Sequence, residues 1–220
     1  MLDIAENINR VRSTLPPYVN LLCVSKFQPK EAILAAYRCG ERHFGESRAQ
    51  ELLLKATTLP PDVKWHFIGH LQTNKIRAIL PYVWSIDSVD SAHLLDAIER
   101  EAKRLDRKIR VLLEVHVAQE TTKSGWQEDE LVQWVEHDGW KKYEHICFAG
   151  LMGMATNTTD ENRLKADFHL LNDIFDFCRT RIEGFETLSM GMSEDYMYAI
   201  NEDANEVRIG SMIFGERNYA

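Results

Sequence analysis

Residues 21–26 read Leu-Leu-Cys-Val-Ser-Lys, a short apolar run that ends in two polar residues, and Pro29 follows shortly after it. A short apolar run closed by a proline-containing turn is typical of a buried strand rather than a helix. Its last residue, Lys26, has two interpretations. It marks the point where the strand meets water, since lysines are rarely buried, or it points into a pocket. In a pocket, desolvation lowers the pKa of a lysine, and the neutral amine can form a Schiff base with a carbonyl.

Strand and helix patterns alternate along the rest of the chain. The expected strands cover residues 21–25, 42–45, 65–68, 83–86, 109–117, 146–152, a segment that starts at 186–188, and 206–209. The expected helices cover residues 3–14, 29–39, 46–57, 74–80, 91–105, 128–137, 161–182 and 194–200, and residues 213–220 are expected to close the fold. Such alternation predicts βα units with a parallel sheet. Eight units in this length favour a closed (β/α)8 barrel of the TIM type with an extra N-terminal helix, and a doubly wound open sheet is the alternative.

Length, composition and charge limit the functions that the chain can have. It has 220 residues, of which 45% are hydrophobic and 27% are charged, as in an ordinary soluble globular protein. No linker, low-complexity segment or repeat interrupts the sequence, so residues 1–220 are expected to form one domain. A formal net charge of -8 argues against a general nucleic-acid binder, which needs a basic face. No apolar run is long enough for a transmembrane helix, so no membrane partner is expected.

The N-terminus and the cysteines indicate the cellular compartment. The first residues are acidic and amphipathic, without the basic start and apolar core of a signal peptide. The four cysteines, at positions 23, 39, 147 and 178, are widely spaced and form no C-x-x-C motif. A disulfide framework is therefore not expected, and a reduced cytoplasmic setting fits best.

In a barrel of this kind, the active site lies at the C-terminal ends of the strands. The last two strands end in Ser193 and in the run Arg208-Ile209-Gly210-Ser211. Glycine lets backbone N–H groups approach a phosphate and serine adds a hydroxyl donor, so these two loops are candidates for a phosphate site. Ser193 alone is equally well explained as the N-cap of the following helix. A lysine amine together with a phosphate site suggests a phosphorylated aldehyde, either pyridoxal phosphate (PLP) or a sugar phosphate bound by a Schiff-base aldolase.

Other motifs give weaker signals. The chain has neither a G-x-G-x-x-G run after a strand nor a G-x-x-x-x-G-K-[ST] loop, so neither dinucleotide nor P-loop binding is supported. His66 and His70 are four residues apart, but they lie on a strand-to-loop segment, and no cysteine or carboxylate completes a metal set. No metal site is therefore expected, and a buried, hydrogen-bonded His66 is the predicted arrangement.

Seven motifs, in the correct order along nearly the whole chain, resemble those of one protein family. They are Val-Ser-Lys at 24–26, Phe-Gly-Glu at 44–46, Trp-His-Phe-Ile-Gly at 65–69, Lys-Ser-Gly at 123–125, Gly-Leu-Met at 150–152, Leu-Ser-Met-Gly-Met-Ser at 188–193 and Val-Arg-Ile-Gly-Ser at 207–211. By these motifs the chain resembles the pyridoxal phosphate homeostasis protein family (the YggS/PROSC type), which is related to the barrel domain of alanine racemase.

The resemblance implies a (β/α)8 barrel that holds PLP as a Schiff base on Lys26, with phosphate contacts from the loops after the last two strands. The implied cofactor-binding residues are Lys26, Ser47, Met152, Ser189, Ser193, Arg208, Gly210 and Ser211. In the loop after the seventh strand, the resemblance implies that either Ser189 or Ser193 contacts the phosphate. It also implies that Arg208 lies beside the pyridine nitrogen. Because arginine cannot accept a proton from the ring, the ring becomes a weaker electron sink than one paired with a carboxylate.

Two positions depart from the family pattern. Ser47 stands where the family usually has Asn after Phe-Gly-Glu, so a cofactor contact expected there is either lost or made through water. His70 stands where the family often has Pro, and it adds a titratable group near the mouth of the site.

A racemase needs a second acid/base group facing the lysine. In alanine racemase this group is a tyrosine from a separate C-terminal domain, whereas this chain ends at Ala220, just after the expected barrel closes. We therefore expect a protein of intracellular PLP (vitamin B6) homeostasis that stores or delivers PLP without substantial turnover. The alternative is a racemase-like PLP-dependent enzyme that uses Lys26 with Tyr196 or His70.

Delivery of PLP requires recipients, for which PLP-dependent apo-enzymes are the expected class. Lys123, expected in the loop after the fifth strand, is either a second amine that receives the aldehyde during transfer or a solvated loop lysine. No long exposed apolar helix face is apparent, so a monomer is expected.

Overall fold

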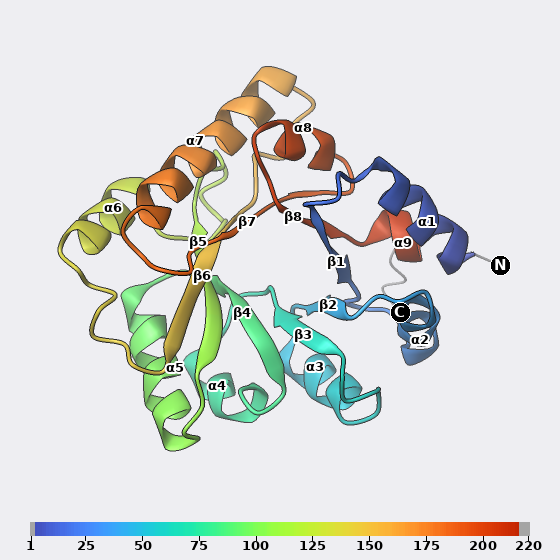
Figure 1. Cartoon of the computed structure of the whole chain (residues 1–220), viewed down its shortest axis with the longest axis horizontal. Coiled ribbons are helices and arrows are strands. Elements are labelled where there is room, and N and C mark those ends of the chain that lie inside the picture. The colour runs from blue at the N-terminus through green and yellow to red at the C-terminus, as the bar shows by residue number, and fades with distance from the viewer. Residues whose placement is uncertain (1–2, 216–220) are drawn as a thin grey trace.

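The computed structural model describes residues 3–215, and its strands form a closed parallel barrel with helices around it (Figure 1). The strands are β1 (Asn20–Val24), β2 (His43–Glu46), β3 (Lys64–Phe67), β4 (Val83–Val89), β5 (Ile109–Val115), β6 (Ile146–Gly153), β7 (Thr187–Met192) and β8 (Glu206–Ile209). They follow one another around the barrel in chain order, and β8 pairs in parallel with β1 to close it. The predicted (β/α)8 barrel is confirmed, and the doubly wound alternative is wrong.

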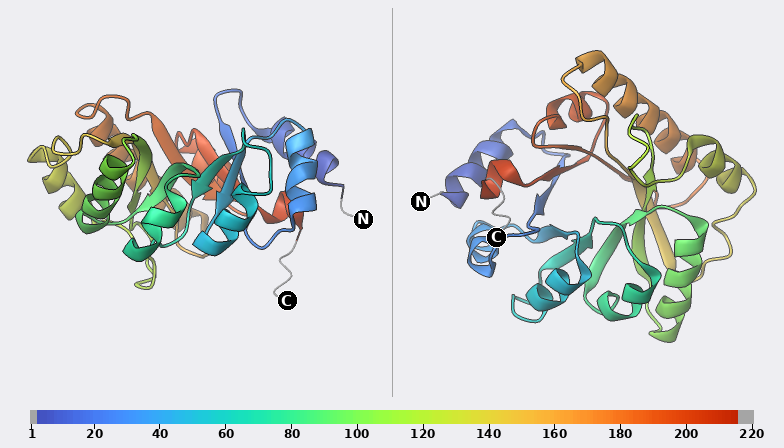
Figure 2. Two further views of the ribbon diagram at one scale, coloured as in Figure 1. Left: turned by 90° about the horizontal axis from the view of Figure 1, so that it is seen from below. Right: turned by 180° about the vertical axis from the view of Figure 1, so that it is seen from behind.

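The helices cover the outside of the barrel, as the two further views show (Figure 2). They are α1 (Ile4–Thr14), α2 (Lys30–Arg38), α3 (Ala49–Ala56), α4 (Thr73–Ile79), α5 (Ala92–Arg104), α6 (Glu128–Glu136), α7 (Glu161–Arg179), α8 (Tyr196–Asn201) and α9 (Ser211–Phe214). The predicted N-terminal helix is α1, which begins at Asp3, whose side chain accepts from the Glu6 backbone N–H at 3.1 Å. It packs on α2 and α9, and Asn7 donates to the Ile213 carbonyl at 3.0 Å. Helix α1 thereby joins the two ends of the described chain.

The β-strand alternation separates two environments on β5. Val111 and Leu113 belong to the large apolar core between the strands and the helices. Leu112, between them, belongs to a separate small apolar cluster with Ala149 and Met152. Since successive side chains of a strand point to opposite faces, Leu112 and its alternate neighbours point into the barrel. The apolar core therefore lies mainly outside the barrel wall.

The structure extends one strand beyond its predicted end and gives another the end that the sequence left open. Strand β4 continues through Asp87 to Val89 instead of ending at residue 86, because Asp87 and Ser88 find buried hydrogen-bond partners. Only the start of β7, at residues 186–188, was predicted; the strand covers Thr187–Met192, so Ser189 lies within it and Ser193 directly follows its end.

The C-terminal part differs from prediction in two further ways. Helix α8 begins at Tyr196, not at residue 194, and its N-cap residue is Asp195. The alternative role of Ser193 as N-cap is therefore wrong. Residues 213 and 214 belong to the short helix α9, which the sequence did not predict, and residues 216–220 of the expected closing tail lie outside the described residues.

Gly150 of β6 provides a test of strand packing. Its φ is +154°, and a Cβ built there would lie 1.8 Å from the Thr187 carbonyl oxygen of the neighbouring strand β7. Gly150→Ala is expected to lower the free energy of unfolding by about 3 kcal/mol or more. Gly184→Ala is the matched control, since φ is +75° there but nothing lies within 4 Å, so only backbone strain of about 1–2 kcal/mol is expected. Chemical denaturation measures both, and equal losses would contradict the role given to the close approach.

Candidate functional site

A cavity of about 410 Å³ lies at the C-terminal ends of the strands. The segments that follow β1, β5, β6, β7 and β8 all contribute residues to its lining. This volume falls within the range of small-molecule sites, and its place matches the usual active-site face of such barrels.

The structure brings most of the predicted cofactor residues together in this cavity. Those that line it are Lys26, Met152, Ser193, Arg208, Gly210 and Ser211. They come from five different loops or strands, so only the closed barrel places them side by side. Of the two interpretations of Lys26, the one in which it faces a pocket is the one that the structure bears out.

Ser47 lies elsewhere. It lines a second cavity of about 470 Å³, together with His70, Lys75 and other residues of the loops after β2 and β3. Its backbone packs closely against Gly69, where a Cβ would lie 2.4 Å from the Ser47 carbonyl oxygen. A contact between Ser47 and the cofactor therefore stays a prediction. The position of Ser47 in a different cavity from Lys26 does not favour such a contact.

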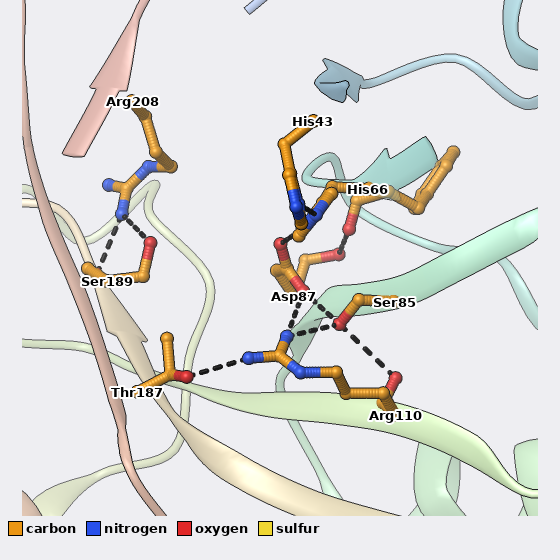
Figure 3. Close-up of polar contacts among 10 residues, drawn as sticks. His43, His66, Ser85, Asp87, Arg110, Thr187, Ser189 and Arg208 are labelled. Carbon is orange, nitrogen blue, oxygen red and sulfur yellow. Dashed lines mark hydrogen bonds and ion pairs between the residues drawn. The ribbon is translucent and has the colours of Figure 1, made fainter. Parts of the chain in front are cut away.

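Arg208 lies at the bottom of the first cavity and is almost completely buried. Its Nη1 donates to the Ser189 carbonyl at 2.7 Å and to Ser189 Oγ at 3.0 Å (Figure 3). Its Nη2 donates to the Gly153 carbonyl at 2.8 Å. Burial lowers the pKa of Arg208 from the ordinary value of arginine, while the carboxylates of Glu206 and Asp195 oppose the shift. These hydrogen bonds fix the plane of the guanidinium from β6 and β7.

The same contacts distinguish the two serines that the resemblance offers as phosphate ligands. Ser193 lines the cavity, whereas Ser189 is fully buried beneath it and accepts from Arg208. At the mouth, Asp195 accepts from the Met192 backbone N–H and holds the loop that carries Ser193. Burial raises the pKa of Asp195, and this hydrogen bond and Arg208 partly offset the rise.

The segments after β5 and β6 form the opposite wall. Lys123 lines the cavity, donates to the Ala155 carbonyl at 2.7 Å and lies 3.1 Å from a carboxylate oxygen of Glu120. It is therefore neither a freely solvated lysine nor buried, but is tethered at the edge of the site.

The barrel interior below Arg208 is polar, whereas branched aliphatic side chains are usual there. His66 lies 2.6 Å from Asp87 through Nδ1 and 2.8 Å from His43 through Nε2 (Figure 3). The predicted buried, hydrogen-bonded His66 is confirmed. Arg110 adds donors to Ser85 at 3.0 Å and to Thr187 at 2.7 Å.

The charges of this network follow from its geometry. Burial disfavours a charged imidazole, but the Asp87 carboxylate and its hydrogen bond outweigh it, so the pKa of His66 is raised. Burial disfavours a charged Asp87 as well, but His66 lowers its pKa below the ordinary value. Burial, followed by the charge on His66, lowers the pKa of His43 to about 4. A neutral His43 can thus accept, through Nδ1, the hydrogen bond that the Nε2–H of a charged His66 donates.

One group of buried side chains has the composition of a metal site. His66, Asp87 and Glu206 each offer a ligand atom, and these atoms lie within 4.8 Å of one another. Both ring nitrogens of His66 are already engaged, however, and the Arg110 guanidinium lies 3.9 Å from Asp87. The positive charge that the carboxylates need is therefore supplied by side chains, and the group is better described as an ion-pair network than as a metal centre.

Sequence reasoning missed Glu114, which is buried on the inner side of β5 beside the cavity. Its Oε2 accepts from Ser124 Oγ at 3.2 Å, and burial raises its pKa to about 7, with the Ser124 hydrogen bond opposing. The available signal was a carboxylate within the apolar run of residues 109–117.

The proposed second acid/base groups do not reach the cavity. Tyr196 Oη lies 3.0 Å from Thr14 Oγ1 of α1, and Tyr196 is not among the described residues that line the cavity. His70 is 67% exposed and lies 3.3 Å from Asp90. Among the cavity-lining residues that the structure describes there is neither a tyrosine nor a histidine.

Comparison with known proteins identifies a matching family model and similar curated proteins. Residues 2–218 match the family model described as alanine racemase, N-terminal domain. The pyridoxal phosphate homeostasis protein of Schizosaccharomyces pombe is 32% identical, with 99% of this chain and 94% of the relative covered. That of Homo sapiens is 36% identical, with 91% and 77% covered.

Solved structures agree with this result. PipY of Synechococcus elongatus PCC7942, whose structure has PLP bound, is 34% identical with a TM-score of 0.87, covering 96% of this chain and all of PipY. An alanine racemase of Clostridium difficile 630 superposes with a TM-score of 0.78 at 17% identity, covering 97% of this chain and 56% of the racemase. At that identity the racemase shows a shared fold alone. Within residues 3–215, every helix is too short or too polar to cross a membrane.

Glu114 predicts a specific pH dependence. Because its pKa is raised from 4.5 to about 7, the stability that it contributes is fully present below pH 4.5 and is lost as the pH rises to about 7. Glu114→Gln keeps the shape of the side chain but cannot ionise, so the variant should not lose this stability as the pH rises. The variant is expected to gain up to about 3 kcal/mol in free energy of unfolding over the parent between pH 5 and pH 7.5, at about 1.4 kcal/mol per pH unit.

Denaturation curves at the two pH values measure this difference. Exposed Glu136 on α6 provides the control, since Glu136→Gln is expected to change stability equally at both. A pH-independent effect of Glu114→Gln would contradict the ionisation assigned to Glu114.

Proposed function

The chain belongs to the family of pyridoxal phosphate homeostasis proteins, within the alanine racemase N-terminal domain family, and on that premise we propose that it binds PLP in the 410 Å³ cavity. Its role is vitamin B6 homeostasis, in which PLP is held on Lys26 and stored or delivered. The observation that carries the proposal is the convergence of a lysine amine, a buried arginine and a serine- and glycine-lined edge on one cavity.

The residues present fit the three functional parts of PLP. The Lys26 amine suits the aldehyde, the fixed guanidinium of Arg208 suits the pyridine nitrogen, and Ser193, Gly210 and Ser211 suit the phosphate. PLP supplies, when bound, an aldehyde and an electron-accepting ring. Lys26 would hold the aldehyde end of PLP through its amine Nζ.

The surroundings of Lys26 and Arg208 favour the binding of PLP over catalysis of a reaction with it. Arg208 offers only donors, so it binds the ring nitrogen without a carboxylate to protonate it. Tyr196 and His70, which a racemase-like reaction would need, are directed elsewhere. The alternative is a racemase-like PLP-dependent enzyme, and racemisation of alanine by the purified protein at ordinary enzymatic rates would support it instead.

Further parts of this role are also proposed. Residues 1–220 act as one domain and as a monomer in the cytoplasm. The recipients are PLP-dependent apo-enzymes. Lys123, whose amine is tethered across the cavity, receives the aldehyde during transfer. A slower transfer to an added apo-enzyme by Lys123→Ala, with unchanged PLP binding, is the observation that supports this last step.

The direct test is an absorbance spectrum of the purified protein before and after borohydride reduction, with mass spectrometry of the Lys26 peptide. A visible band that is trapped by reduction on Lys26 supports PLP and excludes a sugar-phosphate aldolase. A colourless protein that fails to bind added PLP would contradict the proposal.

Lys26→Ala separates the covalent and the noncovalent parts of binding. The variant is expected to lose the visible band and the reductive trapping, since no amine remains, but to keep measurable PLP affinity through the phosphate contacts. Lys30→Ala, at the exposed start of α2, is the control and should behave as the parent. Full retention of the band by Lys26→Ala would refute the assignment of the amine.

Arg208→Gln tests the ring-nitrogen contact. The dissociation constant for PLP is expected to rise at least about tenfold, or about 1.4 kcal/mol, because the guanidinium fork is lost. Circular dichroism and thermal unfolding check that the barrel remains folded. Arg208→Lys keeps the positive charge but not the planar guanidinium, so its dissociation constant for PLP should lie between those of the parent and Arg208→Gln. Unchanged affinity in both variants would show that Arg208 does not contact PLP.

A further inference from the structure

Three charged side chains form a buried cluster next to Lys26, and none of them lines the cavity. Lys55 of α3 places its Nζ 2.8 Å from Glu46 Oε1 at the end of β2 and 2.6 Å from Glu51 Oε1, also on α3. The side chains of Lys55 and Glu46 are 7% and 0% exposed, and that of Glu51 is 19% exposed. We refer to these residues as the Glu46–Lys55–Glu51 cluster.

The cluster holds both chain neighbours of Lys26. On the N-terminal side, Lys55 Nζ donates to the Ser25 carbonyl at 2.8 Å, and Ser25 Oγ donates to Glu46 Oε1. On the C-terminal side, the Phe27 backbone N–H donates to Glu51 Oε1 at 2.6 Å. The backbone on either side of the amine-bearing residue is thus fixed by one connected set of charges.

The turn needs such support, because Phe27 has a φ of +65°. This left-handed conformation is unfavourable for a bulky residue other than glycine and persists only where the surroundings enforce it. Besides Glu51, the guanidinium of Arg48 lies over the Phe27 ring at 4.6 Å from its centroid. Backbone strain at the residue after Lys26 is therefore matched by contacts dedicated to it.

The cluster is a poor device for stability alone. Buried ion pairs rarely repay the loss of their hydration. Burial raises the pKa of Glu46 to about 7 even though Lys55 and Ser25 oppose the shift, and Glu46 Oε2 has no hydrogen-bond partner among the described residues. Burying these charges costs stability, and it does so beside the turn that carries the Lys26 amine. This indicates that the cluster serves the position of that turn rather than stability.

We propose that the Glu46–Lys55–Glu51 cluster is the positioning unit of Lys26: it clamps Ser25 and Phe27 so that the amine is held in reach of an aldehyde in the cavity. The inference rests on the proposed function and assigns the residues that control covalent capture rather than affinity. Misplacing a reacting group by about 1 Å can cost two orders of magnitude in rate.

The test compares two ligands on Glu51→Ala, since Glu51 is the least buried member and its loss removes the Phe27 contact. The rate of covalent PLP capture is expected to fall at least about tenfold. The affinity for pyridoxine 5'-phosphate, which has no aldehyde, should stay within about twofold, since the phosphate and ring contacts remain. Glu51→Gln restores an oxygen acceptor for the Phe27 N–H and is expected to recover most of the rate.

Glu41→Ala is the matched control. Glu41 is likewise a buried carboxylate in an ion pair, 2.6 Å from Arg12, but it precedes β2 and so lies at the other end of the barrel from Lys26. It should lower stability without slowing PLP capture. Equal slowing by Glu41→Ala and Glu51→Ala would show a general loss of stability and overturn the inference.

A second readout requires no PLP. In Glu51→Ala, the Phe27 amide is expected to exchange its hydrogen faster, and the pH profile of Lys26 reductive methylation should differ from that of Glu51→Gln. If the parent binds neither ligand, the proposed function fails while this readout still tests the clamp. If the parent captures PLP and Glu51→Ala captures it equally fast with unchanged amide exchange, the positioning role is refuted and the proposed function stands.

Discussion

An arginine enclosed in the barrel is the constraint on which the rest of the site depends, because a buried charge without partners is very costly. Arg208 meets this constraint by donating to Ser189 and to the Gly153 carbonyl, which belong to β7 and β6. Ser189 is consequently committed to the guanidinium, and the loop after β7 must supply another hydroxyl to the cavity. Ser193 has that place. The position of one cation thus decides which of two nearby serines faces the cavity.

The same cation explains why the inside of the barrel is polar. The carboxylates of Glu206, Asp195, Asp87 and Glu114 all stabilise the charged form of Arg208 against burial. Carboxylates buried in such number need positive charge of their own, which His66 and Arg110 provide lower in the barrel. Apolar packing is therefore moved to the outside of the strands, where the helices cover it. The barrel combines an apolar outer core with a charged interior that leads upward to the cavity.

Period and turn signals were sufficient to predict the barrel, because βα alternation is recorded locally along the chain. The ends of β4 and β7 were not predictable in this way, since Asp87 and Ser189 look like loop residues until their partners on other strands are known. For the same reason the sequence could pair Lys26 with the phosphate loops by barrel topology, but it could not separate Ser47 into another cavity. Whether a charged side chain is buried depends on its contacts with other strands. The sequence of its own strand therefore gives little indication of that burial.

The two ends of the cavity bind in different ways, and the difference suits a carrier. The arginine end is held by fixed hydrogen bonds and offers only donors, so under the proposed function it would orient the ring of PLP without activating it. The lysine end stands on a strained turn, and under the proposed function the geometry of that turn would control a reversible bond between Lys26 and the aldehyde. Lys123, across the cavity, is a second amine, and it is tethered near the site by Ala155 and Glu120. Under the proposed function, a site with firm orientation, reversible attachment and neither a tyrosine nor a histidine among its described lining residues is suited to retaining PLP rather than converting it. This combination follows from the barrel geometry and is what storage and delivery of a reactive aldehyde require.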